Sequence, residues 1–114
     1  MKVSGLFKNA TEVLEVPAGT VIFEEGSVGD EMYGVIEGEV EVRIHGNVRT
    51  LGPDDTFGEL AIIDSSSRSG TAVAATDVKL AVINRRTFLF LVHETPMFAL
   101  QVMSSIADRL RARD

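Results

Sequence analysis

Apolar and polar positions alternate with a period of two in short runs through the first 84 residues. The clearest run is Glu39–His45, in which Val40, Val42 and Ile44 face one way and charged residues face the other. Gly, Pro, Asp and Asn interrupt these runs at intervals of about ten residues, which is typical of an all-β barrel or sandwich. The pattern therefore predicts an antiparallel β-roll over about residues 11–84.

The other runs complete a set of about eight strands. We expect them at Thr11–Val16, Val21–Phe23, Met32–Ile36, Val48–Leu51, Thr71–Ala75 and Val78–Ile83. Gly46-Asn47 is predicted to form the two-residue loop of a hairpin, because both residues tolerate the positive φ that such turns need.

The spacing of apolar residues changes after Asn84, where two helices are predicted. Arg85–His93 forms the first, with Asn84 as its N-cap. The second begins at Thr95-Pro96 and runs to about Ala112, since Thr caps well and Pro suits the first helical position. Its apolar stripe is expected to pack against the roll, with a dimer seam as the alternative. The stripe consists of Ala99, Val102, Met103, Ile106 and Leu110.

These elements predict a mainly β, α+β fold, in which a β-roll or jelly roll is followed by C-terminal helices over about residues 85–112. The length of 114 residues allows one compact domain, so we expect residues 1–114 to form a single unit. No apolar run approaches the roughly 20 residues that cross a bilayer. The chain has no cysteine, which excludes disulfides and thiolate chemistry, and a cytoplasmic location is the default expectation.

Charge is unevenly distributed along this chain, whose net charge is −6. The part before Arg68 has 13 acidic and 4 basic residues, whereas the part from Arg68 onward has 7 basic and 4 acidic ones. Because the chain as a whole is acidic, it lacks the basic character that phosphate backbones require, and we expect no direct DNA binding. Any anion must be held by local donors and not by the overall field.

The segment Phe57–Ile63 and the polar loop after it are not explained by core packing. Gly58-Glu59-Leu60-Ala61 is predicted to open a single helical turn, whose first amides are free to bind an anion. Gly58 lets a ligand approach the backbone closely. Arg68 follows after a short loop, and its guanidinium can bind a phosphate through paired hydrogen bonds.

Glu59 is informative because a carboxylate beside an anion site repels the ligand unless it accepts a hydrogen bond from a donor. A ribose hydroxyl next to a phosphate is such a donor, and a charged hydrogen bond to it is worth about 1.5–3 kcal/mol. The alternative is that Glu59 and Arg68 form an ion pair that closes the loop.

The motifs around these residues resemble those of the cyclic nucleotide-binding domain. This β-roll is shared by bacterial catabolite-activator-type regulators, regulatory subunits of cyclic AMP-dependent protein kinase and cyclic nucleotide-gated channels. The phosphate-binding cassette of that family is similar to Phe57-Gly58-Glu59-Leu60-Ala61 and Ser67-Arg68-Ser69-Gly70. Pro17–Gly26, Gly29–Tyr33 and Val35–Val40 look like its opening strands, glycine turns and central strand. The resemblance covers nearly the whole chain.

The resemblance implies a role for each cassette residue. Arg68 would bind the cyclic phosphate and Glu59 the ribose 2′-hydroxyl, while Ser69 and the amides of Leu60 and Ala61 would bind the remaining phosphate oxygens. The predicted ligand-binding set is Gly58, Glu59, Leu60, Ala61, Arg68 and Ser69. The predicted base pocket is Val42, Val48, Leu110 and Arg113. Val42 and Val48 are equally well explained as core residues.

We therefore expect a binding module that senses a cyclic nucleotide and relays its occupancy through the C-terminal helices. Ser69 favours cyclic AMP over cyclic GMP, because a Thr at this position often accompanies cyclic GMP preference in the family. The alternative is a degenerate roll that binds a protein and no nucleotide. A homodimer or an effector protein would use the last helix in either case.

Two residues depart from the family pattern, and both weaken the expected affinity. Ser67 replaces the usual Pro and Gly70 the usual Ala, so this segment loses more conformational entropy when it folds. No enzyme, metal or cofactor is expected, since the ligand is the nucleotide itself. The two histidines, His45 and His93, fit solvated surface positions better than metal ligation.

Overall fold

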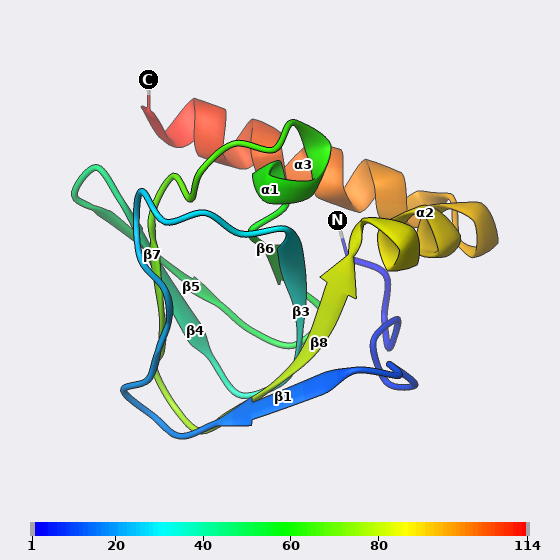
Figure 1. Cartoon of the computed structure of the whole chain (residues 1–114), viewed down its shortest axis with the longest axis horizontal. Helices are drawn as coiled ribbons and strands as arrows, with labels where there is room; N and C mark the ends of the chain where they lie inside the picture. Colours follow the sequence, from blue (N-terminus) through cyan, green and yellow to red (C-terminus); the bar gives the residue numbers. More distant parts are fainter. Residues whose placement is uncertain (1, 114) are drawn as a thin grey trace.

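The computed structural model describes residues 2–113, with side chains as far as Arg111, and forms two four-stranded antiparallel sheets that face each other (Figure 1). The strands are β1 (Val13–Val16), β2 (Val21–Phe23), β3 (Glu31–Glu37), β4 (Val40–Ile44), β5 (Asn47–Leu51), β6 (Thr56–Phe57), β7 (Thr71–Ala74) and β8 (Val78–Asn84). One sheet has the order β1-β8-β3-β6 and the other β2-β7-β4-β5. The predicted β-roll of about eight strands followed by helices is confirmed; only β6 was not expected as a strand.

The long strands β3 and β8 are buried on both faces. On the inner face, Val35 and Leu80 belong to the core inside the roll. On the outer face, Met32 and Ile83 belong to a second core under the helices, together with Phe98. Successive side chains of a strand point to opposite faces, so these two strands hold the roll and the helical layer together.

The β4–β5 hairpin turns one residue earlier than the sequence predicts. Its loop is His45-Gly46, where both residues have positive φ (49° and 81°), and Ile44 pairs with Asn47. A shift of one residue exchanges the two faces of a strand. Val48 is therefore exposed, whereas Arg49 lies opposite Val42 and faces the interior.

Three helices follow or interrupt the strands: α1 (Leu60–Ile63), α2 (Arg85–Glu94) and α3 (Met97–Arg113). The Asn84 side chain accepts a hydrogen bond from the Thr87 amide at 2.8 Å, which confirms the predicted N-cap of α2. In Figure 1, α3 extends above the end of the roll with α1 beside it. None of the helices in the described residues has the length and apolar character to cross a membrane.

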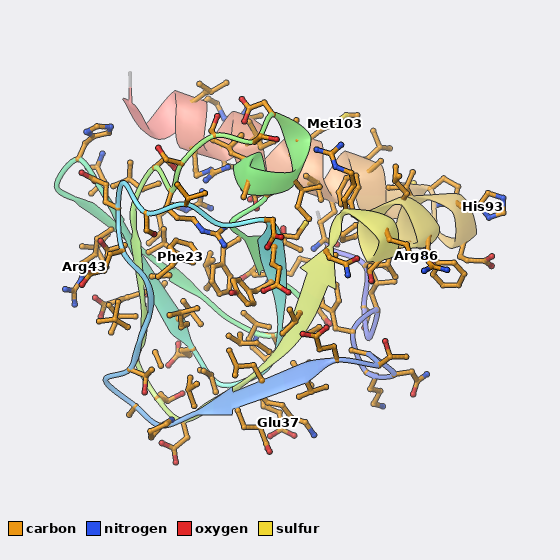
Figure 2. All side chains as sticks on the ribbon, viewed as in Figure 1. Phe23, Glu37, Arg43, Arg86, His93 and Met103 are labelled. Carbon is orange, nitrogen blue, oxygen red and sulfur yellow. The ribbon has the colours of Figure 1, made fainter. Side chains whose placement is uncertain are left out.

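The buried face of α3 differs from the predicted stripe. Phe98, Gln101 and Val102 are at most 3% exposed, whereas Met103 and Leu110 are about 60% exposed. Figure 2 shows Met103 on the outer side of α3. The predicted packing is confirmed for Val102 and Ile106, which belong to or pack against the core under the helices, and is wrong for Met103 and Leu110. Hydropathy alone does not reveal Gln101, which is buried with both halves of its amide hydrogen-bonded, so that the cost of burying a polar group is removed.

The N-terminal residues pack between α3 and the sheet. Phe7 is 2% exposed and meets Phe98 edge to face, with ring centroids 6.1 Å apart. A Cβ added to Gly34 would come within 2.6 Å of atoms of the Phe7 ring. The absence of a side chain at Gly34 therefore makes room for Phe7, which holds residues 2–10 against β3 and α3.

Candidate functional site

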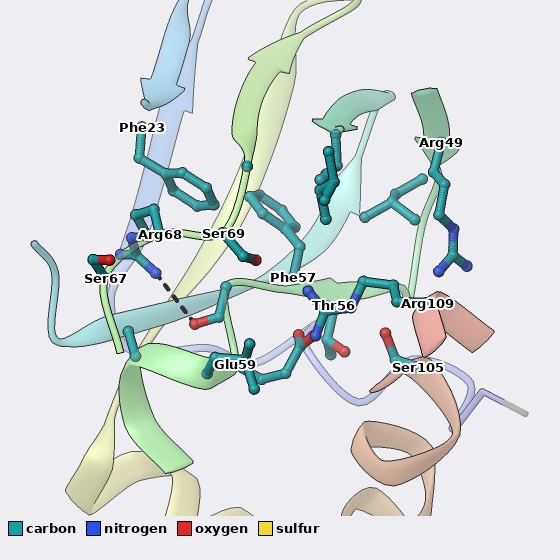
Figure 3. A pocket seen from close by; sticks show the side chains of 17 residues that line it. Phe23, Arg49, Thr56, Phe57, Glu59, Ser67, Arg68, Ser69, Ser105 and Arg109 are labelled. Atoms are coloured by element: carbon teal, nitrogen blue, oxygen red, sulfur yellow. Dashed lines mark hydrogen bonds and ion pairs between the residues drawn. The ribbon is translucent and has the colours of Figure 1, made fainter. Parts of the chain in front are cut away.

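A pocket lies at the end of the roll that α1 and α3 cover (Figure 3). It holds about 510 Å³ of space between protein atoms, its open mouth included. A second pocket of about 660 Å³ adjoins it, since both are lined by Val42, Ile44, Arg49, Leu60, Ser69 and Arg109. The first contains the buried charged groups, and the second extends between the β4–β5 hairpin and the end of α3.

The structure brings most of the predicted site residues together here. The first pocket is lined by all six predicted ligand-binding residues, namely Gly58, Glu59, Leu60, Ala61, Arg68 and Ser69. Val42 lines both pockets, and Leu110 lines the second. Val48 does not line either pocket, because the register of the hairpin places it on the outer face with 57% exposure. The side chain of Arg113 lies outside the described residues.

Arg68 is fixed by its own main chain. Its amide donates to the Ser27 carbonyl and its carbonyl accepts from the Gly26 amide, both at 2.8 Å. Before it, the Asp64 carboxylate accepts from the Ser66 amide at 3.0 Å and from the Ser66 hydroxyl, which lowers the pKa of Asp64. These bonds form a local turn of the Asx type and define the path of the loop that delivers Arg68.

Arg68 is 6% exposed, and its guanidinium lies over the Phe23 ring, 4.2 Å from the ring centroid. Its Nη1 donates to the Gly58 carbonyl at 3.2 Å, and its Nε has no hydrogen-bond partner among residues 2–113. Gly58 has φ of +79°, and a Cβ there would come within 2.8 Å of the Arg68 Nη1. The positive φ therefore favours glycine at position 58, and any other residue would also displace the guanidinium.

Glu59 is fully buried and forms an ion pair with Arg109 of α3. The predicted alternative, an ion pair between Glu59 and Arg68, is therefore wrong: the two side chains face the same pocket without pairing. Burial raises the pKa of Glu59, and the nearby Arg109 and Arg49 charges act in the opposite direction. Arg109 contacts Oε1, while Oε2 has no hydrogen-bond partner within the described part of the chain.

The amides of α1 differ partly from expectation. The Ala61 amide donates to the Gly58 carbonyl at 3.3 Å, so it is already engaged in a turn of the i→i+3 type. The bond is longer than the usual 2.9–3.0 Å of an N–H to oxygen hydrogen bond. The helical turn predicted over these residues is present as α1, with Glu59 as its N-cap residue.

Several lining residues were not expected from the sequence. Arg109 and Ser105 reach the pocket from α3, and Arg49 reaches it from β5. Thr56 is 3% exposed, and its hydroxyl has no partner among the described side chains and backbone groups. The i, i+4, i+8 spacing of Gln101, Ser105 and Arg109 is the signal that places them on one helical face.

No group of three or more His, Cys, Asp or Glu side chains that could hold a metal ion occurs in residues 2–113. His45 is in the hairpin turn and His93 near the end of α2, both exposed. Figure 2 shows His93 pointing away from the roll.

Comparison with known proteins identifies the family. The sequence model of the family described as "Cyclic nucleotide-binding domain" matches residues 13–95, which include all eight strands, α1 and α2. The chain belongs to the cyclic nucleotide-binding domain family. The resemblance predicted from the cassette residues is thus confirmed.

Relatives of this cyclic nucleotide-binding domain occur in several kinds of protein. The chain is 38% identical over 104 residues to the cyclic AMP receptor protein of Thermus thermophilus, covering 86% of the chain and 48% of that protein. It is 40% identical over 83 residues to a cAMP-dependent protein kinase regulatory subunit of Aspergillus fumigatus, covering 70% of the chain and 20% of that protein. The chain therefore spans about half or less of the length of these two relatives.

One similar solved structure has nearly the same extent as this cyclic nucleotide-binding domain. It is described as "A cyclic-GMP-dependent signalling pathway regulates bacterial phytopathogenesis". It aligns with a TM-score of 0.78 and 30% identity, and the alignment covers 97% of this chain and 95% of that one. The names of the similar proteins thus include both cyclic AMP and cyclic GMP.

Proposed function

We propose that this chain is a regulatory, non-catalytic module that binds a cyclic nucleotide, cyclic AMP in preference to cyclic GMP, and relays its occupancy through α2 and α3. One observation carries the proposal. Two buried groups of opposite charge, the Arg68 guanidinium and the Glu59 carboxylate, line one pocket and each keeps a polar atom without a partner among residues 2–113. A cyclic nucleotide has an anionic phosphate for the first and a ribose hydroxyl for the second.

The phosphate is assigned to Arg68. Burial strengthens the attraction between a guanidinium and an anion, because less water screens it. Arg68 faces the pocket with its backbone already fixed, so little conformational entropy is lost when it binds. Gly58, Leu60, Ala61 and Ser69 surround the same space. Gly58 would allow the close approach, the Leu60 amide and the Ser69 hydroxyl would be further donors, and the Ala61 amide would exchange its 3.3 Å bond to the Gly58 carbonyl for the phosphate.

The ribose hydroxyl is assigned to Glu59, and Arg109 explains how a carboxylate is tolerated next to an anion site. The ion pair offsets the charge of Glu59 through Oε1 and leaves Oε2 to accept the hydroxyl. A buried carboxylate without its partner would be strongly destabilising. Arg109 therefore supports recognition of the ribose from α3, outside the cassette.

The base is assigned to the second pocket, where Val42 of β4 and Ile106 and Leu110 of α3 provide apolar contacts. Arg113 remains a predicted capping residue at the end of the helix. Ser69 lines both pockets and is the residue on which the preference for cyclic AMP rests.

Relay through the helices is supported by the origin of the lining residues. The first pocket takes residues from the roll and from α3, and so does the second. A ligand that contacts α3 only when the helix is close to the roll binds that arrangement better and shifts the population toward it. The chain would act in the cytoplasm, without contacting DNA directly.

A protein partner on α3 is a second candidate, either a second copy of the chain or an effector. Leu100, Met103 and Leu110 are 47–61% exposed on this helix, and their i, i+3, i+10 spacing places them along one side. If the chain is a sensor, this surface would pass the signal to the partner. If the chain is a degenerate roll that binds no nucleotide, binding the partner through this surface would be its only role.

Calorimetric titration of cyclic AMP and cyclic GMP into the nucleotide-free protein tests the proposal. We expect saturable binding of both, with cyclic AMP tighter, and a loss of about 100-fold in affinity for Arg68→Leu, because a charge-assisted phosphate contact is removed. Arg43→Leu is the matched control, since Arg43 is exposed and pairs with Glu41 away from the pocket.

Absence of binding by either nucleotide, in protein shown to be folded and empty, would reject the sensor. Sedimentation of the same protein would then decide whether α3 binds a second copy. Equal losses for Arg68→Leu and Arg43→Leu would place the phosphate elsewhere.

A further inference from the structure

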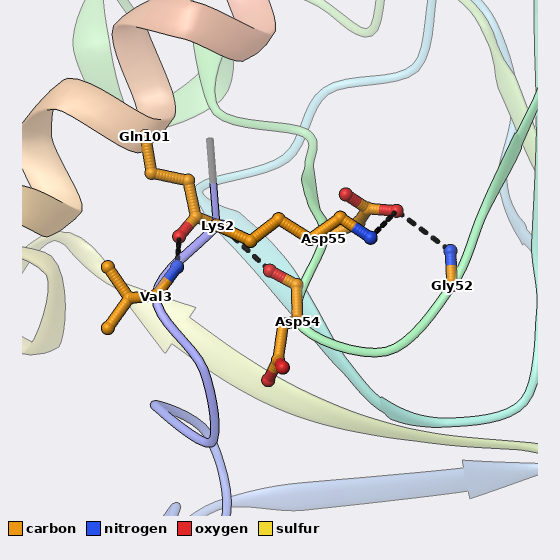
Figure 4. Close-up of polar contacts among 6 residues, drawn as sticks. All are labelled: Lys2, Val3, Gly52, Asp54, Asp55 and Gln101. Atoms are coloured by element: carbon orange, nitrogen blue, oxygen red, sulfur yellow. Dashed lines mark hydrogen bonds and ion pairs between the residues drawn. The ribbon is translucent and has the colours of Figure 1, made fainter.

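The N-terminal segment Lys2–Gly5 is tied to α3 and to the β5–β6 turn by side-chain contacts (Figure 4). The Val3 amide donates to Gln101 Oε1 at 2.7 Å, and Gln101 Nε2 donates to the Asp54 carbonyl at 2.7 Å. The Gly5 amide donates to the Asp54 carboxylate at 3.1 Å. One glutamine side chain thus joins three segments that are far apart in the sequence.

Gln101 is unusual among the residues that hold α3 in place. It is 3% exposed and uses its carbonyl oxygen toward the N-terminal segment and its amide nitrogen toward the turn. An apolar residue at this place would pack but would leave the Val3 amide and the Asp54 carbonyl without this partner. The two hydrogen bonds of the glutamine therefore fix the orientation of α3 against the turn, in addition to the contact that any buried side chain would make.

The segment that Gln101 holds on the roll leads directly to the pocket. Asp54 has φ of +73° and its amide donates to the Val35 carbonyl at 2.8 Å, which fixes the turn on β3. Asp55 accepts from the Gly52 amide at 2.9 Å and pairs with Lys2 at 3.4 Å. Thr56, whose buried hydroxyl lines the pocket, follows immediately.

The contacts of Gln101 with Val3 and Asp54 form a clamp between the N-terminal segment, the β5–β6 turn and α3. Along α3, this clamp leads to the same pocket. Ser105 and Arg109 follow Gln101 at i+4 and i+8 and therefore lie on the same helical face. Both line the pocket, and Arg109 pairs with Glu59. The position of Gln101 against the turn accordingly sets where Arg109 enters the site.

We infer that Gln101 is a positioning residue for the nucleotide site, and that the N-terminal segment Lys2–Gly5 acts through it to hold α3 closed over the pocket. This inference rests on the proposed function. Removal of the clamp allows α3 to move away while the cassette stays in place. The ligand then leaves faster, and its rate of arrival changes little.

Gln101→Met is the direct test, because methionine keeps the length of the side chain and removes both hydrogen bonds. We expect cyclic AMP to dissociate about tenfold faster from this variant with a nearly unchanged association rate, measured by stopped flow. Asp77→Ala is the matched control. Asp77 also accepts from a distant backbone amide, that of Ala18 at 2.9 Å. It lies in the turn between β7 and β8, at the opposite end of the roll from α3 (Figure 1).

Deletion of Lys2–Ser4 removes the other half of the clamp. We expect the deletion to give part of the faster dissociation, because Gln101 Nε2 keeps its bond to the Asp54 carbonyl. The deletion combined with Gln101→Met should add almost nothing to Gln101→Met alone, because that substitution already breaks the bond to Val3. Additive effects of the two changes would overturn the inference. So would equal dissociation rates in Gln101→Met and Asp77→Ala.

Hydrogen exchange of the nucleotide-free protein separates this inference from the proposed function. We expect the amides of Ser105–Leu110 to exchange about tenfold faster in Gln101→Met, with β3 and β8 unchanged. This result would support the clamp even if no cyclic nucleotide bound. A variant that binds nucleotide normally and exchanges faster only next to residue 101 would show a merely local structural role and would reject the clamp.

Discussion

The two walls of the pocket are built differently. The wall that carries Arg68 belongs to the roll, and hydrogen bonds to its neighbours fix the main chain of Arg68 on both sides. The opposite wall belongs to α3, where Arg109 reaches Glu59 as a side chain on a helix that is held mainly through Phe98, Gln101 and Val102. The first wall is preorganised for recognition, whereas the second is the movable wall of our proposal, which would shift relative to the roll when the ligand binds or leaves.

This difference assigns the affinity for the ligand to the wall on the roll and the conformational switch to the wall on α3. A residue fixed by its backbone contributes nearly the same contact in every state of the protein, so it determines whether the ligand binds. A residue on a movable helix contributes only when the helix is close, so it determines which state the ligand stabilises. Substitutions in the two walls should therefore have different signatures.

The largest effect we expect among tests of this comparison is on Glu59, where the two walls meet. Glu59→Gln should weaken cyclic AMP binding by about tenfold, because a charged hydrogen bond to the ribose hydroxyl becomes a neutral one. Binding of 2′-deoxy cyclic AMP should change little. Titration of both nucleotides measures this, and thermal unfolding checks that the variant folds. Equal losses for both nucleotides would show that Glu59 does not contact the ribose.

Gly70→Ala tests how firmly the roll side is fixed. Gly70 is buried, and an added Cβ would come within 2.5 Å of the Arg43 carbonyl oxygen of β4. Although alanine is usual here in the family, we expect this substitution to lower the free energy of unfolding by about 1–3 kcal/mol, because the chain must shift to admit it. Urea denaturation provides the measurement. A gain in stability would mean that reduced entropy of the unfolded chain outweighs the contact.

Leu110→Ala tests the movable wall. Leu110 lines the second pocket but is 59% exposed, so truncation removes only part of an apolar contact. We expect a loss of about threefold in cyclic AMP affinity, most of it in the dissociation rate. Met103→Ala, equally exposed on α3 but outside both pockets, should leave affinity unchanged. A loss for Met103→Ala equal to that for Leu110→Ala would point to a general effect on the helix.

The smallest effect concerns pH. Burial raises the pKa of Glu59 above its ordinary value of 4.5, so the folded state binds this proton more tightly than the unfolded chain does. The contribution of Glu59 to stability is therefore greatest at low pH and declines as the pH rises through the raised pKa. Urea denaturation of wild type and Glu59→Gln across this range should show the wild type losing stability relative to the variant. The opposite slope would mean that attraction to Arg109 outweighs burial.

The sequence predicted the preorganised wall better than the movable one. The strand pattern, the cassette and the N-cap at Asn84 are local signals, and local signals survive in the fold because hydrogen bonding and turn chemistry act over a few residues. The six cassette residues all reach one pocket for this reason. Their roles toward a nucleotide remain predictions.

Two of the errors concern which face of an element is buried. The hairpin turn at His45-Gly46, one residue from the predicted position, exchanges Val48 for Arg49 in the interior. On α3, the burial of Gln101 depends on contacts with residues 3 and 54, which no local pattern reveals. Partners distant in sequence decide which face of an element is buried, so periodicity alone could not identify Arg109 as the partner of Glu59.

The aromatic stack beside Arg68 also gives the molecule an optical reporter. Tyr33 is the single tyrosine in a chain without tryptophan, so all tyrosine emission from the protein comes from one known place. Its ring stacks on Phe57 with centroids 5.3 Å apart, and the Arg68 guanidinium lies 5.9 Å from its centroid. Burial raises the pKa of Tyr33, which keeps its phenol neutral across the physiological range. Label-free spectroscopy can therefore follow events at Arg68 in the unmodified protein.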